Sequence, residues 1–150
     1  MSALKDQLQS DLTASIKARD ELRSSTLRMA LAAITNEEVA GKEARQLSDD
    51  DVIVVLTREA KKRREAADAY DEANRPELAA RERDELAVLT TYLPEPLSQD
   101  ELTAIIAAAV AESGASGPGG IGAVMKIVQP QVKGRADGGQ VAALVRAALG

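Results

Sequence analysis

The chain has 150 residues, a formal net charge of −5, and neither cysteine nor histidine. Disulfides and thiol nucleophiles are therefore excluded, and the commonest metal ligand and commonest general base near neutral pH are missing. Tyr70 and Tyr92, the two aromatic residues, are too few for a base-stacking surface. No apolar run approaches the roughly 20 residues of a transmembrane helix, and the N-terminus lacks the apolar core of a secretory signal. We expect a cytoplasmic protein without membrane association, metal or cofactor.

The first part of the chain has apolar residues at helical spacing. Steps of three or four predict two amphipathic helices, the first carrying Leu4, Leu8, Leu12 and Ile16 and the second Leu27, Leu31 and Ile34. Ser48 followed by Asp51 is a capping-box pattern that predicts the start of a third helix. Its coiled-coil-like seam consists of Ile53, Leu56, Ala60, Arg63, Ala67 and Tyr70. Pro76 then starts a fourth helix, which should pair with the third as an antiparallel hairpin.

Pro94 and Pro96 mark a domain boundary, because two prolines within three residues end a helix. The charge balance also changes there. Residues 1–96 contain 15 Lys and Arg against 20 Asp and Glu, whereas residues 97–150 contain four of each. We therefore predict an acidic helical domain over 1–94 and a small neutral domain over 95–150.

The second domain is predicted to hold three short helices. Ser98 and Asp137 stand where helix caps are expected, and Pro130 is expected to end the middle helix. No segment alternates in the manner of a strand. The predicted fold class is all-α: a helical hairpin plus two further helices, followed by a three-helix domain.

The connection before the last predicted helix combines glycine with positive charge. Lys133 and Arg135 flank Gly134, which allows close approach of the backbone, and the helix start after Asp137 offers free N–H groups. The segment from Ser113 to the C-terminus has one acid and four bases, Lys126, Lys133, Arg135 and Arg146. These features suit a phosphate contact. They equally suit a glycine turn with a capping aspartate, although neither Lys133 nor Arg135 is needed for the turn or the cap.

A second basic stretch lies in the third predicted helix, where Arg58, Lys61 and Lys62 share a face. Such a strip could bind phosphates. A solvated helix face is the favoured interpretation, because Glu59 can pair with Arg63 and mixed charges of this kind usually keep helices soluble.

Three separated stretches of the chain resemble the GatB/YqeY-domain family, in particular its stand-alone YqeY-like members: LRMALAAITNEE, LTREAKKRREAADAYDEANRPELAARERDELAVLTTYLPEPLS and VMKIVQPQVKGRADGGQVAALVRAAL. The resemblance covers nearly the whole chain and implies an N-terminal helical domain followed by a three-helix domain. The latter is similar to the tail domain of the B subunit of glutamyl/aspartyl-tRNA amidotransferase, which contacts tRNA outside the catalytic centre. The resemblance implies tRNA contact centred on Lys126, Lys133, Gly134, Arg135 and Asp137.

The resemblance does not imply catalysis. The kinase-like catalytic domain of the amidotransferase and the subunit that releases ammonia have no counterpart in these 150 residues. We interpret the carbon–nitrogen ligase activity with glutamine as amido-N-donor, commonly ascribed to the family, as a description inherited with the shared domain. No nucleophile has a base beside it, so the sequence leaves enzyme activity open and favours a non-catalytic tRNA-binding accessory protein. The alternative is an interaction module that docks on a tRNA-amidotransferase or aminoacyl-tRNA synthetase complex, and an enzyme acting alone ranks last.

Overall fold

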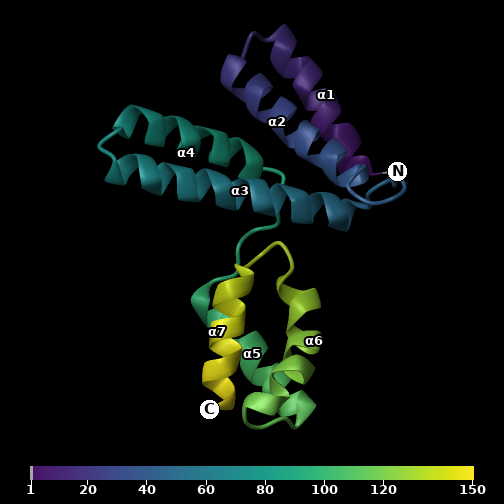
Figure 1. Cartoon of the computed structure of the whole chain (residues 1–150), viewed down its shortest axis with the longest axis vertical. Coiled ribbons are helices and arrows are strands. Elements are labelled where there is room, and N and C mark those ends of the chain that lie inside the picture. Colours follow the sequence, from purple (N-terminus) through teal and green to yellow (C-terminus); the bar gives the residue numbers. More distant parts are fainter. Residues whose placement is uncertain (1) are drawn as a thin grey trace. The chain divides into compact units, whose positions relative to one another are not determined.

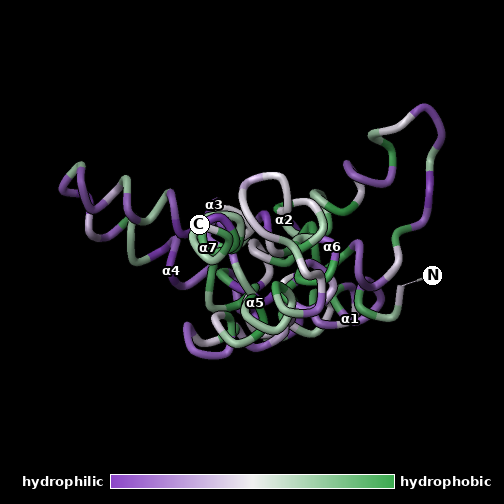
Figure 2. Tube along the Cα trace, turned by 90° about the horizontal axis from the view of Figure 1, so that it is seen from below, coloured by the Kyte–Doolittle hydropathy of each residue, from purple (hydrophilic) through white to green (hydrophobic). Residues whose placement is uncertain are grey.

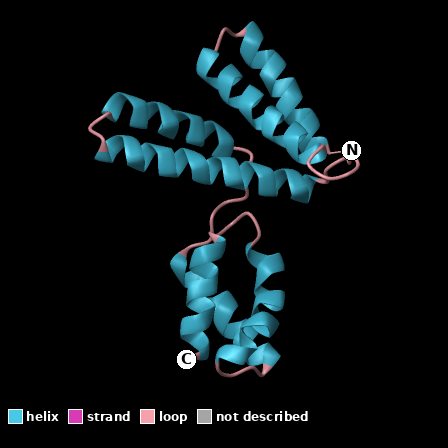
Figure 3. Cartoon of the chain, viewed as in Figure 1, coloured by secondary structure: helices cyan, strands magenta, loops and turns pink. Residues whose placement is uncertain are grey.

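The computed structural model describes residues 2–150, which form seven α-helices and one short 3₁₀ turn, with no strand among them (Figures 1 and 3). The helices are α1 (Ala3–Lys17), α2 (Glu21–Glu38), α3 (Asp49–Glu72), α4 (Pro76–Thr90), α5 (Gln99–Ser113), α6 (Ile121–Val132) and α7 (Gly138–Leu149), with the 3₁₀ turn η1 (Pro118–Gly120) before α6. The predicted all-α class is confirmed. The chain divides into two compact units, unit 1 (Met1–Leu93) and unit 2 (Pro94–Gly150).

Unit 1 consists of the antiparallel pair α1–α2 and the longer hairpin α3–α4 (Figure 1). Its core is aliphatic, and the fully buried large side chains include Leu8, Leu27, Ile34, Leu47, Leu56 and Leu89. Burying each such side chain stabilises the fold by about 1.5–3 kcal/mol. Leu8, Leu27, Ile34 and Leu56 lie on the apolar stripes predicted from the sequence, so the helical periodicity determines which faces of α1, α2 and α3 turn inward.

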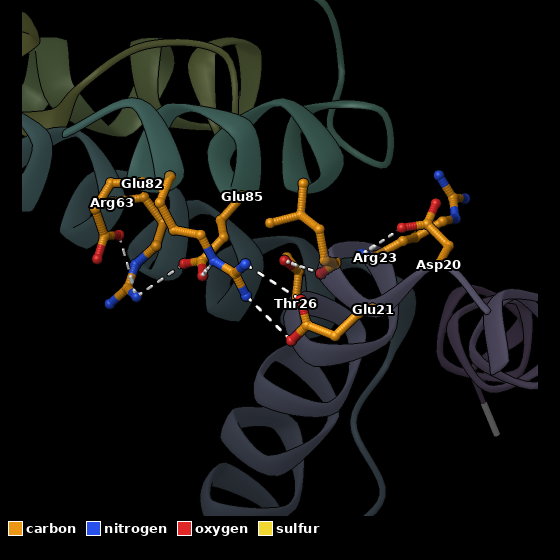
Figure 4. A network of polar contacts seen from close by, with 9 residues as sticks. Asp20, Glu21, Arg23, Thr26, Arg63, Glu82 and Glu85 are labelled. Atoms are coloured by element: carbon orange, nitrogen blue, oxygen red, sulfur yellow. Dashed lines mark hydrogen bonds and ion pairs between the residues drawn. The ribbon is translucent and has the colours of Figure 1, made fainter. Parts of the chain in front are cut away.

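The hairpin α3–α4 carries small and charged side chains along much of its seam. Ala60, Ala67 and Ala79 are buried there, and α4 includes many hydrophilic residues (purple in Figure 2). Arg63 occupies the seam position that the heptad spacing gave it. Its Nη1 lies 3.4 Å from Glu82 Oε2 and 3.4 Å from Glu85 Oε2 (Figure 4). Because Arg63 Nε and Glu82 Oε2 are buried without a hydrogen-bond partner in the described residues, this cluster depends on all three charges being present.

The charged cluster continues from the hairpin to α2. Arg81 places Nε 3.4 Å from Glu85 Oε1 and Nη1 3.2 Å from Glu21 Oε2. The hydrogen bond and the charge of Glu21 raise the pKa of Arg81. Arg81 is exposed, and exposed ion pairs contribute little, so the link to α2 orients the hairpin more than it stabilises it.

Polar side chains also fasten α1 to the rest of unit 1. At its N-terminal end, Asp49 Oδ1 accepts hydrogen bonds from Ser2 Oγ (2.6 Å) and Leu4 N (3.1 Å). The Ser2 hydrogen bond, followed by the bond from the Leu4 amide, lowers the pKa of Asp49. One carboxylate therefore serves the N-terminal ends of both α1 and α3, where helix dipoles favour negative charge.

Tyr92 joins α1 and α2 to the segment after α4. Its hydroxyl donates to Asp11 Oδ2 (2.5 Å) and accepts from Arg23 Nη2 (3.1 Å). Burial, and then the hydrogen bond to Asp11, raise the pKa of Tyr92 to about 12. The phenol stays protonated at neutral pH and acts as a fixed donor between three parts of unit 1.

The helix starts follow the capping residues in the sequence. Ser48 with Asp51 and Ser98 with Glu101 form complete capping boxes, as predicted, and Pro76 is the first residue of α4. In each capping box two backbone N–H groups that the helix itself cannot satisfy donate to side-chain oxygens, so local chemistry is sufficient to place these boundaries.

In unit 2, α5 packs against both α6 and α7 around a second aliphatic core: Leu102, Ile106, Ala109, Val124, Val128, Val132, Val141 and Val145. The expectation that Pro130 ends the middle helix is wrong, since α6 runs on to Val132. A proline near the end of a helix costs the helix only one backbone donor. Burial of the Val132 side chain favours continuing α6 for two residues beyond Pro130. The side chain of Gln131 donates to the Ile127 carbonyl (3.0 Å) in the same turn.

We expect Arg63→Ala to lower the free energy of unfolding of unit 1 by about 2–3 kcal/mol, because two acidic side chains would remain close together in the seam. The chain has no tryptophan and both tyrosines lie in unit 1. Urea unfolding followed by tyrosine fluorescence therefore measures unit 1 alone. Arg64→Ala, at an exposed neighbour that makes no ion pair among the described residues, is the matched control. Equal midpoints for the two variants would contradict this role of Arg63.

We also expect Asp49→Asn to lower the urea midpoint of unit 1 at pH 7. Since the folded-state pKa of Asp49 is below its ordinary value of 3.8, its contribution is complete above that value and is lost as the pH falls through the folded-state pKa. The difference from the wild type should narrow on acidification below about pH 4. Asp50→Asn, in the same helical turn but without a hydrogen bond to α1 among residues 2–150, should show no such narrowing.

Candidate nucleic-acid interface

The predicted basic site lies in the connection between α6 and α7, residues 133–137. Lys133 is the C-cap of α6, and Gly134 adopts a left-handed backbone conformation with φ 75°. The Val132 carbonyl accepts hydrogen bonds from Arg135 N (2.8 Å) and Ala136 N (3.2 Å). Glycine adopts this conformation without steric cost, so Gly134 reverses the chain and brings Lys133 and Arg135 to the same short turn.

The start of α7 is already occupied by a carboxylate. Asp137 is the N-cap, and its Oδ2 accepts from Gln140 N (3.1 Å). The cap confirms the predicted helix start. It also places a negative charge where the helix dipole would otherwise favour a bound anion. Attraction for a phosphate at this connection therefore rests on the basic side chains.

The four basic residues of unit 2 are exposed to different degrees. The side chains of Lys126, Lys133 and Arg146 make no hydrogen bond or ion pair within residues 2–150, and these residues are exposed, whereas Arg135 is half-buried. Lys126 lies within α6, whereas Lys133 is the residue that follows the helix. Arg146 is in the last turn of α7, about 13 Å along the helix from Asp137. The structure thus brings Lys133 and Arg135 together and spreads Lys126 and Arg146 along the two helices that leave the turn.

Arg135 has a structural contact that the sequence did not reveal. Its Nε donates to the Glu95 carbonyl (3.0 Å), and its own carbonyl accepts from Leu97 N (2.9 Å). These contacts belong neither to the turn nor to the helix cap, so the expectation that Lys133 and Arg135 are not needed for either stays a prediction, while the Arg135 side chain has a structural partner of its own. Its partner Glu95 is 40 residues away in sequence, so no local pattern could have indicated it.

The basic strip of unit 1 is largely compensated by acids. Arg58 Nη1 lies 3.4 Å from Glu37 Oε2, and Lys62 Nζ lies 3.2 Å from Glu59 Oε1. Lys61, the third residue of the strip, is exposed. The pair expected between Glu59 and Arg63 is replaced, because Arg63 turns into the α3–α4 seam while Lys62 stays beside Glu59. These contacts favour the interpretation of the strip as an ion-paired helix face.

In the described part of the chain, no three acidic side chains gather closely enough to hold a metal ion. None of its helices combines the length and apolar character needed to cross a lipid bilayer.

A model of the family described as Yqey-like protein matches residues 5–149. The chain belongs to this family. It is 35% identical over 85 residues to "Uncharacterized protein C22F3.15" of Schizosaccharomyces pombe, covering 56% of this chain and 67% of that protein. It is 29% identical over 86 residues to "Altered inheritance of mitochondria protein 41, mitochondrial" of Vanderwaltozyma polyspora, covering 57% of this chain and 46% of that protein. The match thus spans about half of the second relative, and the family resemblance seen in the sequence is confirmed.

We expect Gly134→Ala to destabilise unit 2 by about 1 kcal/mol, because an alanine is strained in the left-handed region. Thermal unfolding followed by far-ultraviolet circular dichroism should show the loss, while tyrosine fluorescence, which reports unit 1, stays unchanged. Gly138→Ala is the control, since its added Cβ meets nothing within 4 Å and its backbone is helical. A Gly134 variant as stable as the Gly138 variant would contradict the requirement for glycine.

Proposed function

We propose that this Yqey-like protein is a non-catalytic accessory protein that contacts tRNA phosphates through the basic turn of unit 2. The observation that carries the proposal is the difference in charge compensation between the two basic regions. Arg58 and Lys62 in unit 1 have acidic partners, whereas in the described part of unit 2 none of the four basic side chains forms an ion pair. Uncompensated positive charge attracts a polyanion even when the whole chain is acidic.

The residue types in unit 2 favour recognition of the phosphate backbone and of RNA shape. Both tyrosines of the chain lie in unit 1, so unit 2 has no aromatic side chain on which a base could stack. Lysine and arginine contacts to phosphates position an RNA without reading its sequence. The resemblance of this unit to the tail domain of an amidotransferase B subunit supports tRNA as the class of RNA.

The double charge reversal Lys133→Glu with Arg135→Glu should weaken tRNA binding at least tenfold at about 50–100 mM salt, since two phosphate contacts become repulsive. The slope of log Kd against log salt concentration should become shallower by about one to two. Fluorescence anisotropy of labelled bulk tRNA over a salt series measures both quantities.

The control is Arg28→Glu with Arg64→Glu, which changes the net charge equally at two exposed residues of unit 1 that make no ion pair within residues 2–150. Equal losses in the two double variants would show that binding follows net charge and not this turn. Wild-type protein that binds no tRNA at any salt would contradict the proposal. Recovery of a synthetase or amidotransferase complex with such a protein would then support the alternative, a protein-interaction module.

A further inference from the structure

Two hydrogen bonds join Arg135 to the segment that precedes α5. Arg135 Nε donates to the Glu95 carbonyl at 3.0 Å, and the Arg135 carbonyl accepts from Leu97 N at 2.9 Å. Leu97 also packs against the core of unit 2. We call these two bonds, which hold residues 95–97 against the turn, the Arg135 clasp.

The clasp orients the arginine side chain. A guanidinium is planar and presents five N–H donors in a fixed fork. With Nε engaged by the Glu95 carbonyl, the plane of the group is fixed and its Nη1 and Nη2 atoms have no partner among residues 2–150. A free arginine loses about 2 kcal/mol of rotamer entropy when it is ordered, and here part of that loss has occurred before any ligand arrives. The side chain of Lys133 makes no hydrogen bond or ion pair within residues 2–150 and has no such advantage.

The clasp also restrains the main chain before α5. Pro94 and Pro96 stand on either side of Glu95 and narrow its backbone conformations, so holding the Glu95 carbonyl in place costs little additional entropy. The side chain of Gln140 in α7 donates to Gln99 Oε1 at 3.0 Å and extends the same attachment to the start of α5. Residues 95–99 are therefore fastened to the turn and to α7 by three hydrogen bonds from two elements.

Resting on the proposed function, we infer that Arg135 couples phosphate binding to the order of residues 95–97, so that this segment belongs to the RNA-binding site. A phosphate on Nη1 and Nη2 holds the guanidinium in the orientation that also serves the Glu95 carbonyl. Coupling between two binding events is reciprocal. The free energy by which the closed clasp strengthens tRNA binding therefore equals the free energy by which bound tRNA stabilises the closed clasp.

The first test uses the unmodified full chain and bulk tRNA. Hydrogen exchange of the Leu97 amide is measured by NMR at low salt, with and without tRNA. Since this amide donates to the Arg135 carbonyl, we expect bound tRNA to slow its exchange by about threefold or more. Exchange that is unchanged by saturating tRNA would overturn the coupling.

The second test compares Arg135→Lys with Arg64→Lys, the same charge-conserving change at an exposed arginine of unit 1 that makes no ion pair within residues 2–150. Lysine cannot hold the Glu95 carbonyl and a phosphate with one rigid fork. Without RNA, we expect faster Leu97 exchange in Arg135→Lys and wild-type exchange in Arg64→Lys. With tRNA, the Arg135 variant should bind about three- to tenfold more weakly, while the Arg64 variant binds like the wild type.

The outcomes separate this inference from the function on which it rests. Wild-type protein that binds tRNA, together with two variants of equal affinity and equal Leu97 exchange, would overturn the coupling and leave the proposed function standing. Wild-type protein that binds no tRNA would overturn both. Circular dichroism of Arg135→Lys tests whether unit 2 of this variant is folded. If it is unfolded, Leu97 hydrogen exchange in the unmodified chain, with and without tRNA, decides whether the coupling exists.

Discussion

The left-handed turn at Gly134 is the constraint on which the candidate interface depends. It reverses the chain between α6 and α7, and it leaves the carbonyl of Arg135 facing the amide of Leu97. A residue with a Cβ is strained in this conformation, so the same glycine that forms the turn also makes the clasp available. The three requirements of the interface, exposed charge at Lys133, an oriented guanidinium at Arg135 and an attached segment before α5, follow from one backbone geometry.

The two units use charged residues in different ways. In unit 1, arginines lie between acids: Arg63 contacts Glu82 and Glu85 inside the hairpin seam, where the three side chains are 13–20% exposed. Partly buried clusters of this kind specify which helices pair and in which register, more than they add stability. In the described part of unit 2 the four positive side chains form no ion pair, although Asp137 lies in the same turn as two of them. The net charge of −5 of the whole chain is therefore compatible with uncompensated positive side chains in unit 2.

The sequence predicted what depends on neighbours along the chain. Helical periodicity identified the buried faces through residues such as Leu8, Leu27 and Leu56, but it was wrong for Ile16, which is 48% exposed at the end of α1. Ser48, Ser98 and Asp137 marked helix starts because capping is a local interaction. The heptad spacing even placed Arg63 in the seam. The sequence could not supply partners that lie far away, such as Glu95 for Arg135 or Glu82 and Glu85 for Arg63. The predicted end of α6 was also wrong. The sequence shows the backbone donor that is lost at Pro130, but it does not show the burial of Val132, which offsets that loss.

The pKa shifts of two side chains show how hydrogen bonds hold unit 1 together. The hydrogen bonds to Asp49 lower the pKa of that carboxyl, and burial with the Asp11 contact raises the pKa of Tyr92 to about 12. Both groups are thereby held more firmly in the protonation state that they already have at neutral pH. The ionised carboxyl of Asp49 therefore accepts hydrogen bonds, and the protonated phenol of Tyr92 donates one, so that both side chains fasten the helices of unit 1.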